Sequence, residues 1–204
     1  MSNDSHAPSE NDYQVRTSAR SGIADSVIGT RNLMITAALA VMGMVLLLPL
    51  NYFAPVAGTT PKALYAGVAI MGIWVIPYLL PATVVRRPGS VMVAALIMGI
   101  ISIFTTPSGP GAIVGNLLGG AFIEVPLALM LYRKWTWWSF LISAAVFGLI
   151  NGILYVLTLK YVVGISFGVS VVVISVISAL IGGLATIGIT KLLNRAGVGI
   201  DAKR

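Results

Sequence analysis

Six long apolar segments, separated by short polar connections, leave this chain few ways to fold. An α-helix needs about 20 residues to cross the hydrocarbon core of a bilayer, and these segments have roughly that length. They are Leu33–Leu50, Ala63–Val85, Ser90–Thr106, Ala112–Tyr132, Trp137–Leu159 and about Phe167–Thr190. The third is short and is followed by Pro107 and Pro110, so a partial crossing stays open for it. The pattern predicts an all-α integral membrane protein with six transmembrane helices.

The composition excludes a soluble protein and most kinds of enzyme. Of the 204 residues, 57% are hydrophobic and 9% are charged, whereas soluble domains carry about 25% charged residues. The chain has no cysteine, and its one histidine, His6, lies in a polar tail, which argues against metal clusters and catalytic triads. Neither a nucleotide-binding phosphate loop nor the common hydrolase and protease motifs occur. We therefore expect a non-catalytic protein without cofactor or metal.

The basic residues predict the orientation of the chain. Eleven of the thirteen fall on one side of a six-span arrangement, and the other side has Lys62 and Lys160. The eleven are Arg16, Arg20, Arg31, Arg86, Arg87, Arg133, Lys134, Lys191, Arg195, Lys203 and Arg204. Because cytoplasmic loops carry the excess of Lys and Arg, both termini are predicted to be cytoplasmic. The basic residues form no stripe interleaved with aromatic residues, which argues against a nucleic-acid partner.

The polar ends predict the domain organisation. Residues 1–31 lack apolar periodicity and are expected to form a disordered cytoplasmic tail. Residues 32–194 form the transmembrane domain, and residues 195–204 form a short cytoplasmic tail. Within the domain, Tyr161–Ser166 is expected to be a loop. Asn51–Lys62 is the longest connection between spans, and it is either a plain connection or a lid over an outward-facing site.

Small residues recur at the spacing of helix contacts. Gly115 and Gly119 lie four residues apart, as do Gly148 and Gly152. Small side chains let helix backbones approach closely where lipid gives no hydrophobic drive for association. Packing within this chain is favoured over docking of another membrane subunit.

Glu124 is the one acidic residue between the two polar tails. It lies about midway along the fourth segment, where an ionised side chain costs roughly 2.5–3.5 kcal/mol. Asn116, Gly120 and Glu124 share one helical face at spacings of four residues. A role in ligand binding or ion coupling is favoured, and the alternative is a carboxyl group that only hydrogen-bonds neighbouring helices.

Other polar and aromatic residues suit a flat heterocyclic ligand. Phe147, Asn151 and Tyr155 lie on one stripe of the fifth segment, and Trp74 and Tyr78 lie four residues apart on the second. Aromatic rings stack on a planar ligand while amides hydrogen-bond its edge. Ordinary packing is the competing interpretation of both tyrosines. The predicted substrate-binding residues are Glu124, Trp74, Tyr78, Asn116, Asn151 and Tyr155.

Two stretches resemble a known family. One is Gly72-Ile-Trp-Val-Ile-Pro-Tyr-Leu with the following Arg86-Arg87-Pro88-Gly89, and the other runs from Gly119 through Glu124 and Tyr132 to Trp135. Together they are similar to substrate-binding S components of energy-coupling factor (ECF) transporters, specifically the YkoE-like group linked to thiamin and hydroxymethylpyrimidine. The resemblance covers about residues 65–194. Pro126, just after the glutamate, departs from the pattern of the family.

The resemblance implies a function that fits the pattern of residues. Such proteins have six helices and cytoplasmic termini, lie in the bacterial cell membrane and capture a vitamin from outside. A separate membrane coupling protein, the T protein, and two cytoplasmic ATPases supply the energy. Small residues of the first helix usually meet the T protein, which points to Ala37 and Ala40. A thiamin-like ligand would place its thiazolium or aminopyrimidine against Glu124.

Two alternatives belong to other classes of protein. A small secondary carrier would use Glu124 as its proton site and would transport without ATPase partners. A scaffold subunit would bind no ligand at all. Which vitamin is bound, and whether the coupling module is dedicated or shared, do not follow from the sequence.

Overall fold

A computed structural model describes residues 29–53, 61–133, 135–163 and 168–197. The described part is helical throughout and contains no strand. Its elements are α2 (Thr30–Phe53), α3 (Pro61–Ala69), α4 (Met71–Val85), α5 (Ser90–Thr105), α6 (Gly111–Leu129), α7 (Trp137–Thr158), the π-helix η3 (Leu159–Val163) and α8 (Val169–Arg195). Most of the two predicted tails and of the Asn51–Lys62 connection lies outside the described residues.

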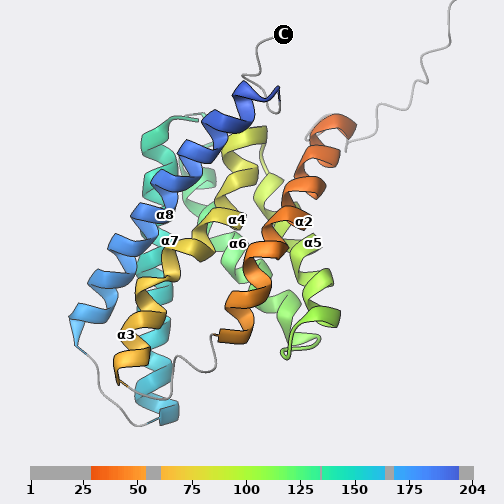
Figure 1. Cartoon of the computed structure of the whole chain (residues 1–204). Coiled ribbons are helices and arrows are strands. Elements are labelled where there is room, and N and C mark those ends of the chain that lie inside the picture. Colours follow the sequence, from red (N-terminus) through yellow and green to blue (C-terminus); the bar gives the residue numbers. More distant parts are fainter. Residues whose placement is uncertain (1–28, 54–60, 134, 164–167, 198–204) are drawn as a thin grey trace, which may run out of the picture.

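The helices form a bundle around α4. This helix packs against α2, α5, α6, α7 and α8, and its span is the most buried of the bundle. In Figure 1, α2 lies beside α5 on one side of the bundle, and α8 lies beside α7 on the other. The start of α2 and the end of α8 lie at the same end of the bundle, as an even number of crossings requires.

Every predicted apolar segment is helical, but the segments differ in length. Among the described residues, five helical stretches are long and apolar enough to cross a membrane, and α5 is shorter, with 16 residues. At 1.5 Å per residue α5 is about 24 Å long, less than the roughly 30 Å of a hydrocarbon core. A multi-pass helical protein is therefore confirmed, and the count of six full crossings stays a prediction.

The second predicted segment is two helices, not one. The break falls at Ile70, between α3 and α4. There the hydroxyl of Ser178 on α8 donates to the carbonyl of Ala69 and accepts from the amide of Gly72, at 2.8 Å in the latter case. A Cβ on Gly72 or on Gly182 of α8 would overlap the facing backbone. The close approach of α8 and the hydroxyl of Ser178 therefore stabilise the break between α3 and α4. The apolar periodicity of the segment does not indicate this break.

Two segment ends also differ from expectation. The α6 helix ends at Leu129 rather than Tyr132, because Leu131 and Tyr132 have positive φ values of 53° and 51°. Residues 161–163, expected to be loop, belong to the π-helix η3, while 164–167 lie outside the described residues.

Three of the four glycines in these pairs pack against another part of the chain. Gly148 and Gly152 of α7 lie against α8, where an added Cβ on Gly148 would come within 2.6 Å of the Ala179 Cβ. Gly119 of α6 lies against the ring of Tyr78, whereas Gly115 faces open space. The preference for packing within this chain is confirmed at three of the four glycines.

Candidate functional site

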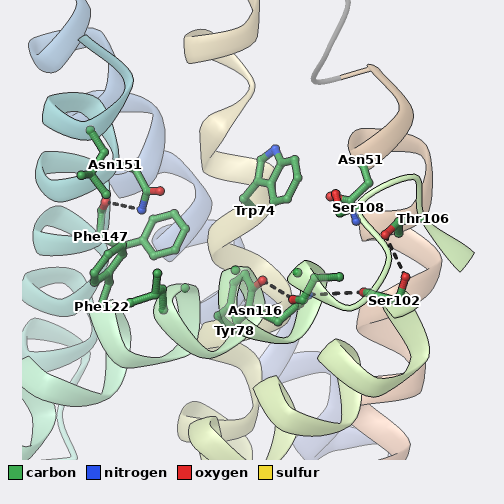
Figure 2. Close-up of a pocket in the computed structure, with 16 residues that line it drawn as sticks. Asn51, Trp74, Tyr78, Ser102, Thr106, Ser108, Asn116, Phe122, Phe147 and Asn151 are labelled. Carbon is green, nitrogen blue, oxygen red and sulfur yellow. Dashed lines mark hydrogen bonds between the residues drawn. The ribbon is translucent and has the colours of Figure 1, made fainter. Parts of the chain in front are cut away.

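A cavity of about 320 Å³ lies between α2, α4, α5, α6 and α7. This is at the small end of the range for ligand pockets, roughly 300–1,000 Å³. It is lined by Asn51, Trp74, Tyr78, Ser102, Thr106, Ser108, Gly111, Ala112, Gly115, Asn116, Leu118, Gly119, Phe122, Phe147, Asn151 and Leu154. The lining includes the end of α2 and the turn between α5 and α6, so the cavity lies toward the end of the bundle opposite the start of α2 (Figure 1). Figure 2 shows Asn51 and Ser108 among the lining residues.

Aromatic side chains from three helices form much of the wall. Tyr78 of α4 and Phe147 of α7 have ring centroids 6.0 Å apart, and Phe122 of α6 lies edge-on to Phe147 at 6.5 Å. Trp74, one turn before Tyr78 on α4, also lines the cavity. These rings offer flat apolar faces of the kind on which a planar ring stacks.

A chain of hydrogen bonds crosses the base of the cavity. The hydroxyl of Tyr78 donates to Asn116 Oδ1 at 2.9 Å. Asn116 Nδ2 donates in turn to the Ala112 carbonyl at 2.8 Å and to Ser102 Oγ at 3.3 Å. This network joins α4, α5 and α6, and it holds two of the predicted binding residues in one arrangement.

Asn151 lies on the opposite wall, on α7. Its Nδ2 donates to the backbone carbonyl of Phe147 at 2.9 Å, one turn earlier on the same helix. Figure 2 shows the amide oxygen of Asn151 on the side toward Trp74. None of the described residues that line the cavity carries a charge.

Four of the six predicted binding residues line this cavity: Trp74, Tyr78, Asn116 and Asn151. Tyr155 lies outside it, packed against the small core formed by Val68, Leu159 and Val171. Phe147, Asn151 and Tyr155 were expected to share one stripe. Each step of four residues turns a helix by about 40° beyond a full turn. A stripe of residues at this spacing therefore rotates around the helix, and at Tyr155 it no longer faces the cavity.

Glu124 also lies outside the lining residues, because its carboxylate binds the start of α5. Oε1 accepts from the amide of Gly89 at 2.8 Å, and Oε2 accepts from the amide of Val91 at 3.2 Å. The hydroxyl of Tyr132 donates to Oε1 at 2.7 Å. The amides at a helix start lack partners within the helix and favour negative charge, so the carboxylate supplies what this terminus needs.

Tyr132 reaches Glu124 because the chain reverses after α6. Its positive φ turns the backbone back, and its ring stacks on Trp135 at 5.8 Å between centroids. Burial, and then the hydrogen bond and charge of Glu124, raise the pKa of the Tyr132 phenol. The phenol therefore stays a proton donor at neutral pH, and the Glu124–Gly89–Tyr132 cluster ties the α4–α5 turn to the segment after α6.

Ala37 and Ala40 of α2, which were predicted to contact the T protein, differ in how deeply they are buried. Ala40 is fully buried in the main core of the bundle, and Ala37 is half-buried. The exposed side of α2 includes Met34, Val41 and Val45. Ala40 is thus not accessible to another subunit in this structure.

Several lining residues were not among those predicted from the sequence. Phe122, Ser102 and Asn51 come from three different helices. Phe147 was expected on the stripe of Asn151 but was not among the predicted binding residues. The others have no neighbouring pattern that separates them from ordinary packing residues.

The fold defines a multi-pass helical membrane protein, and the described residues that line its cavity carry no charge. The chain belongs to the family described as the permease component of ABC-type cobalt transport systems, whose model matches residues 31–150. A crystal structure described as an S component of an ECF transporter has the same fold, with a TM-score of 0.73 and 22% sequence identity. The match covers 83% of this chain and 87% of that one. No curated protein matches the sequence.

Proposed function

We propose that this chain is the substrate-binding S component of an ECF-type importer and that it captures thiamin or a precursor such as hydroxymethylpyrimidine. The observation that carries the proposal is the cavity, which is lined by aromatic rings and by the amides of Asn116 and Asn151. Membership of a transport family and the S-component fold support the same conclusion. Trp74, Tyr78, Asn116 and Asn151 are the proposed contacts to the ligand.

The chemistry of the lining favours an organic ring over a metal ion. Cobalt binds nitrogen, oxygen and sulfur ligands such as imidazole, carboxylate and thiolate. The described lining residues include none of these three groups, and no cluster of three His, Asp or Glu occurs among the described residues. The cobalt in the family's description is therefore not proposed as the cargo of this chain.

The absence of charge in the described lining favours the uncharged precursor over thiamin. A thiazolium would have aromatic faces for cation–π contact but no carboxylate beside it, because Glu124 binds the start of α5. A neutral aminopyrimidine leaves no such charge unpaired in an apolar site. We expect the cavity to bind the pyrimidine ring, which the two molecules share.

Transport itself is proposed to require partners. The sequence has no phosphate loop for ATP hydrolysis, so a membrane T protein and two cytoplasmic ATPases would supply the energy. The exposed side of α2, with Met34, Val41 and Val45, is the proposed contact for the T protein, with Ala37 beside it.

The test combines binding with transport. Mass spectrometry of the detergent-purified protein should find a retained pyrimidine. Calorimetric titration should give saturable binding of both hydroxymethylpyrimidine and thiamin, with hydroxymethylpyrimidine bound more tightly. In proteoliposomes the chain should concentrate neither compound without its partners and ATP. Failure to bind both compounds would refute the proposed ligand.

Uptake driven by a pH gradient, with this chain alone, would instead favour a secondary carrier. The contacts of Glu124 argue against that alternative. Its carboxylate accepts three hydrogen bonds, two of them from backbone amides. A proton site has to exchange protons during transport, whereas this carboxylate stabilises a helix start.

A further inference from the structure

The amide of Asn151 has a fixed orientation. Its Nδ2 lies 2.9 Å from the Phe147 carbonyl, and a carbonyl can only accept a hydrogen bond. The NH₂ group must therefore face the backbone of α7, and the oxygen must face the other way. Asn151 thus offers the cavity a hydrogen-bond acceptor.

The same reasoning sets the orientation of Tyr78. Asn116 Nδ2 lies 2.8 Å from the Ala112 carbonyl, so its NH₂ group faces the helix and its oxygen faces Tyr78. An amide oxygen can only accept, so the Tyr78 hydroxyl must donate its one proton to Asn116. What Tyr78 has left for a ligand is a lone pair. Its oxygen is therefore also an acceptor toward the cavity.

We propose that the cavity recognises its ligand by an N–H donor, through the acceptors Tyr78 Oη and Asn151 Oδ1. The inference rests on the proposed function and narrows its substrate class to planar aromatic amines. An aromatic amine is a weak base that stays neutral, so it suits a lining without charged side chains among the described residues. A carbonyl in place of the amine would set acceptor against acceptor at Tyr78 Oη and Asn151 Oδ1.

The hydrogen bonds of Asn116 strengthen the preference for an amine over a carbonyl. For Tyr78 to donate to a ligand carbonyl, it would have to leave Asn116 Oδ1 unpaired inside the bundle, where Asn116 is 7% exposed. An unsatisfied buried acceptor costs about 1–3 kcal/mol, which corresponds to about 5- to 150-fold in affinity. Asn116 is thus a specificity-determining residue that acts through Tyr78.

The experiment compares two probes that differ at one ring position and in the proton on the neighbouring ring nitrogen. Hydroxymethylpyrimidine carries the exocyclic amine, and its deaminated counterpart carries a carbonyl at that position. Calorimetric titration of the purified wild-type chain should give about 10- to 100-fold tighter binding of the amine. Asn116→Leu frees the Tyr78 proton, and Asn151→Leu removes an acceptor, so each should narrow this ratio by about tenfold.

Controls separate specificity from folding. Asn32→Leu makes the same change at the start of α2, away from the cavity, and should leave the ratio as in the wild type. Tyr78→Phe, which removes one oxygen, should also narrow the ratio and serves if Asn116→Leu fails to fold. Equal binding of both probes by the wild type would overturn the acceptor proposal and leave the proposed function standing. Binding of neither probe would overturn both.

Discussion

Glu124 joins two segments that lie 35 residues apart in the chain. Its carboxylate accepts from the amides of Gly89 and Val91, and Tyr132 donates to it from the turn that follows α6. The side chain is 6% exposed, so these three donors replace the water that a carboxylate would otherwise bind. A lone acidic residue in an apolar helix suggests a ligand-binding role. Here the amides at the start of α5 supply hydrogen bonds to the carboxylate instead.

Glu124→Gln should lower stability and leave ligand affinity nearly unchanged. The amide keeps one acceptor oxygen but places an NH₂ group opposite a backbone N–H, at a cost of about 1–3 kcal/mol. Thermal unfolding in detergent should show a lower midpoint. Titration below that midpoint should give the wild-type affinity for hydroxymethylpyrimidine, because the carboxylate does not line the cavity. A large loss of affinity for hydroxymethylpyrimidine in the folded variant would show that Glu124 takes part in ligand binding.

Side-chain chemistry alone was enough to indicate part of the candidate site. Trp74, Tyr78, Asn116 and Asn151 stand out because amides and aromatic rings at helical spacing are unusual in an apolar segment. Phe122 does not stand out, because a phenylalanine in such a segment is an ordinary packing residue. Its place on the wall depends on how α6 is rotated against α7, which the pattern of one helix does not contain.

The contact between α6 and α4 sets the shape of the cavity. Gly119 lies against Tyr78, and a Cβ added there would lie 2.9 Å from the Tyr78 Cζ. Gly115, one turn earlier on the same wall, has nothing within 4 Å of an added Cβ. The two glycines look alike in sequence, but only Gly119 is needed for close packing.

Gly119→Ala should displace the Tyr78 ring and weaken binding of hydroxymethylpyrimidine by about tenfold or more, since overpacking shifts cost roughly 1–3 kcal/mol. Gly115→Ala is the matched control, with the same change on the same helix and wall, and should bind within a few-fold of the wild type. Titration of both variants checks this. Equal losses would show that added volume, rather than the position of Tyr78, controls affinity.

The cavity and the Glu124 cluster lie toward opposite ends of the bundle. The cavity includes the turn between α5 and α6, and Glu124 binds the turn between α4 and α5, close to Arg86 and Arg87. The excess of basic residues near the second turn predicts that it faces the cytoplasm. The cavity is then on the external side, as capture of a substrate from outside requires.

Cysteine labelling tests this orientation directly, because the chain has no cysteine of its own. Ser108→Cys and Arg87→Cys place single thiols at exposed positions on the two turns. A membrane-impermeant maleimide should label Ser108→Cys in intact cells and should label Arg87→Cys only after permeabilisation. The reverse pattern would invert the topology, and with it the side on which the cavity takes up its ligand.

The apolar segments were sufficient to predict a helical membrane bundle, because each needs only its own hydrophobicity to enter a bilayer. Helical spacing likewise indicated four of the residues that line the cavity. Three features depended on the tertiary structure. The break at Ile70 depends on Ser178 and Gly182 of α8. Tyr155 packs against a separate small core, and Glu124 binds the amides of Gly89 and Val91. Such contacts join residues far apart in the chain, so they follow from how the helices pack and not from the pattern within any one of them.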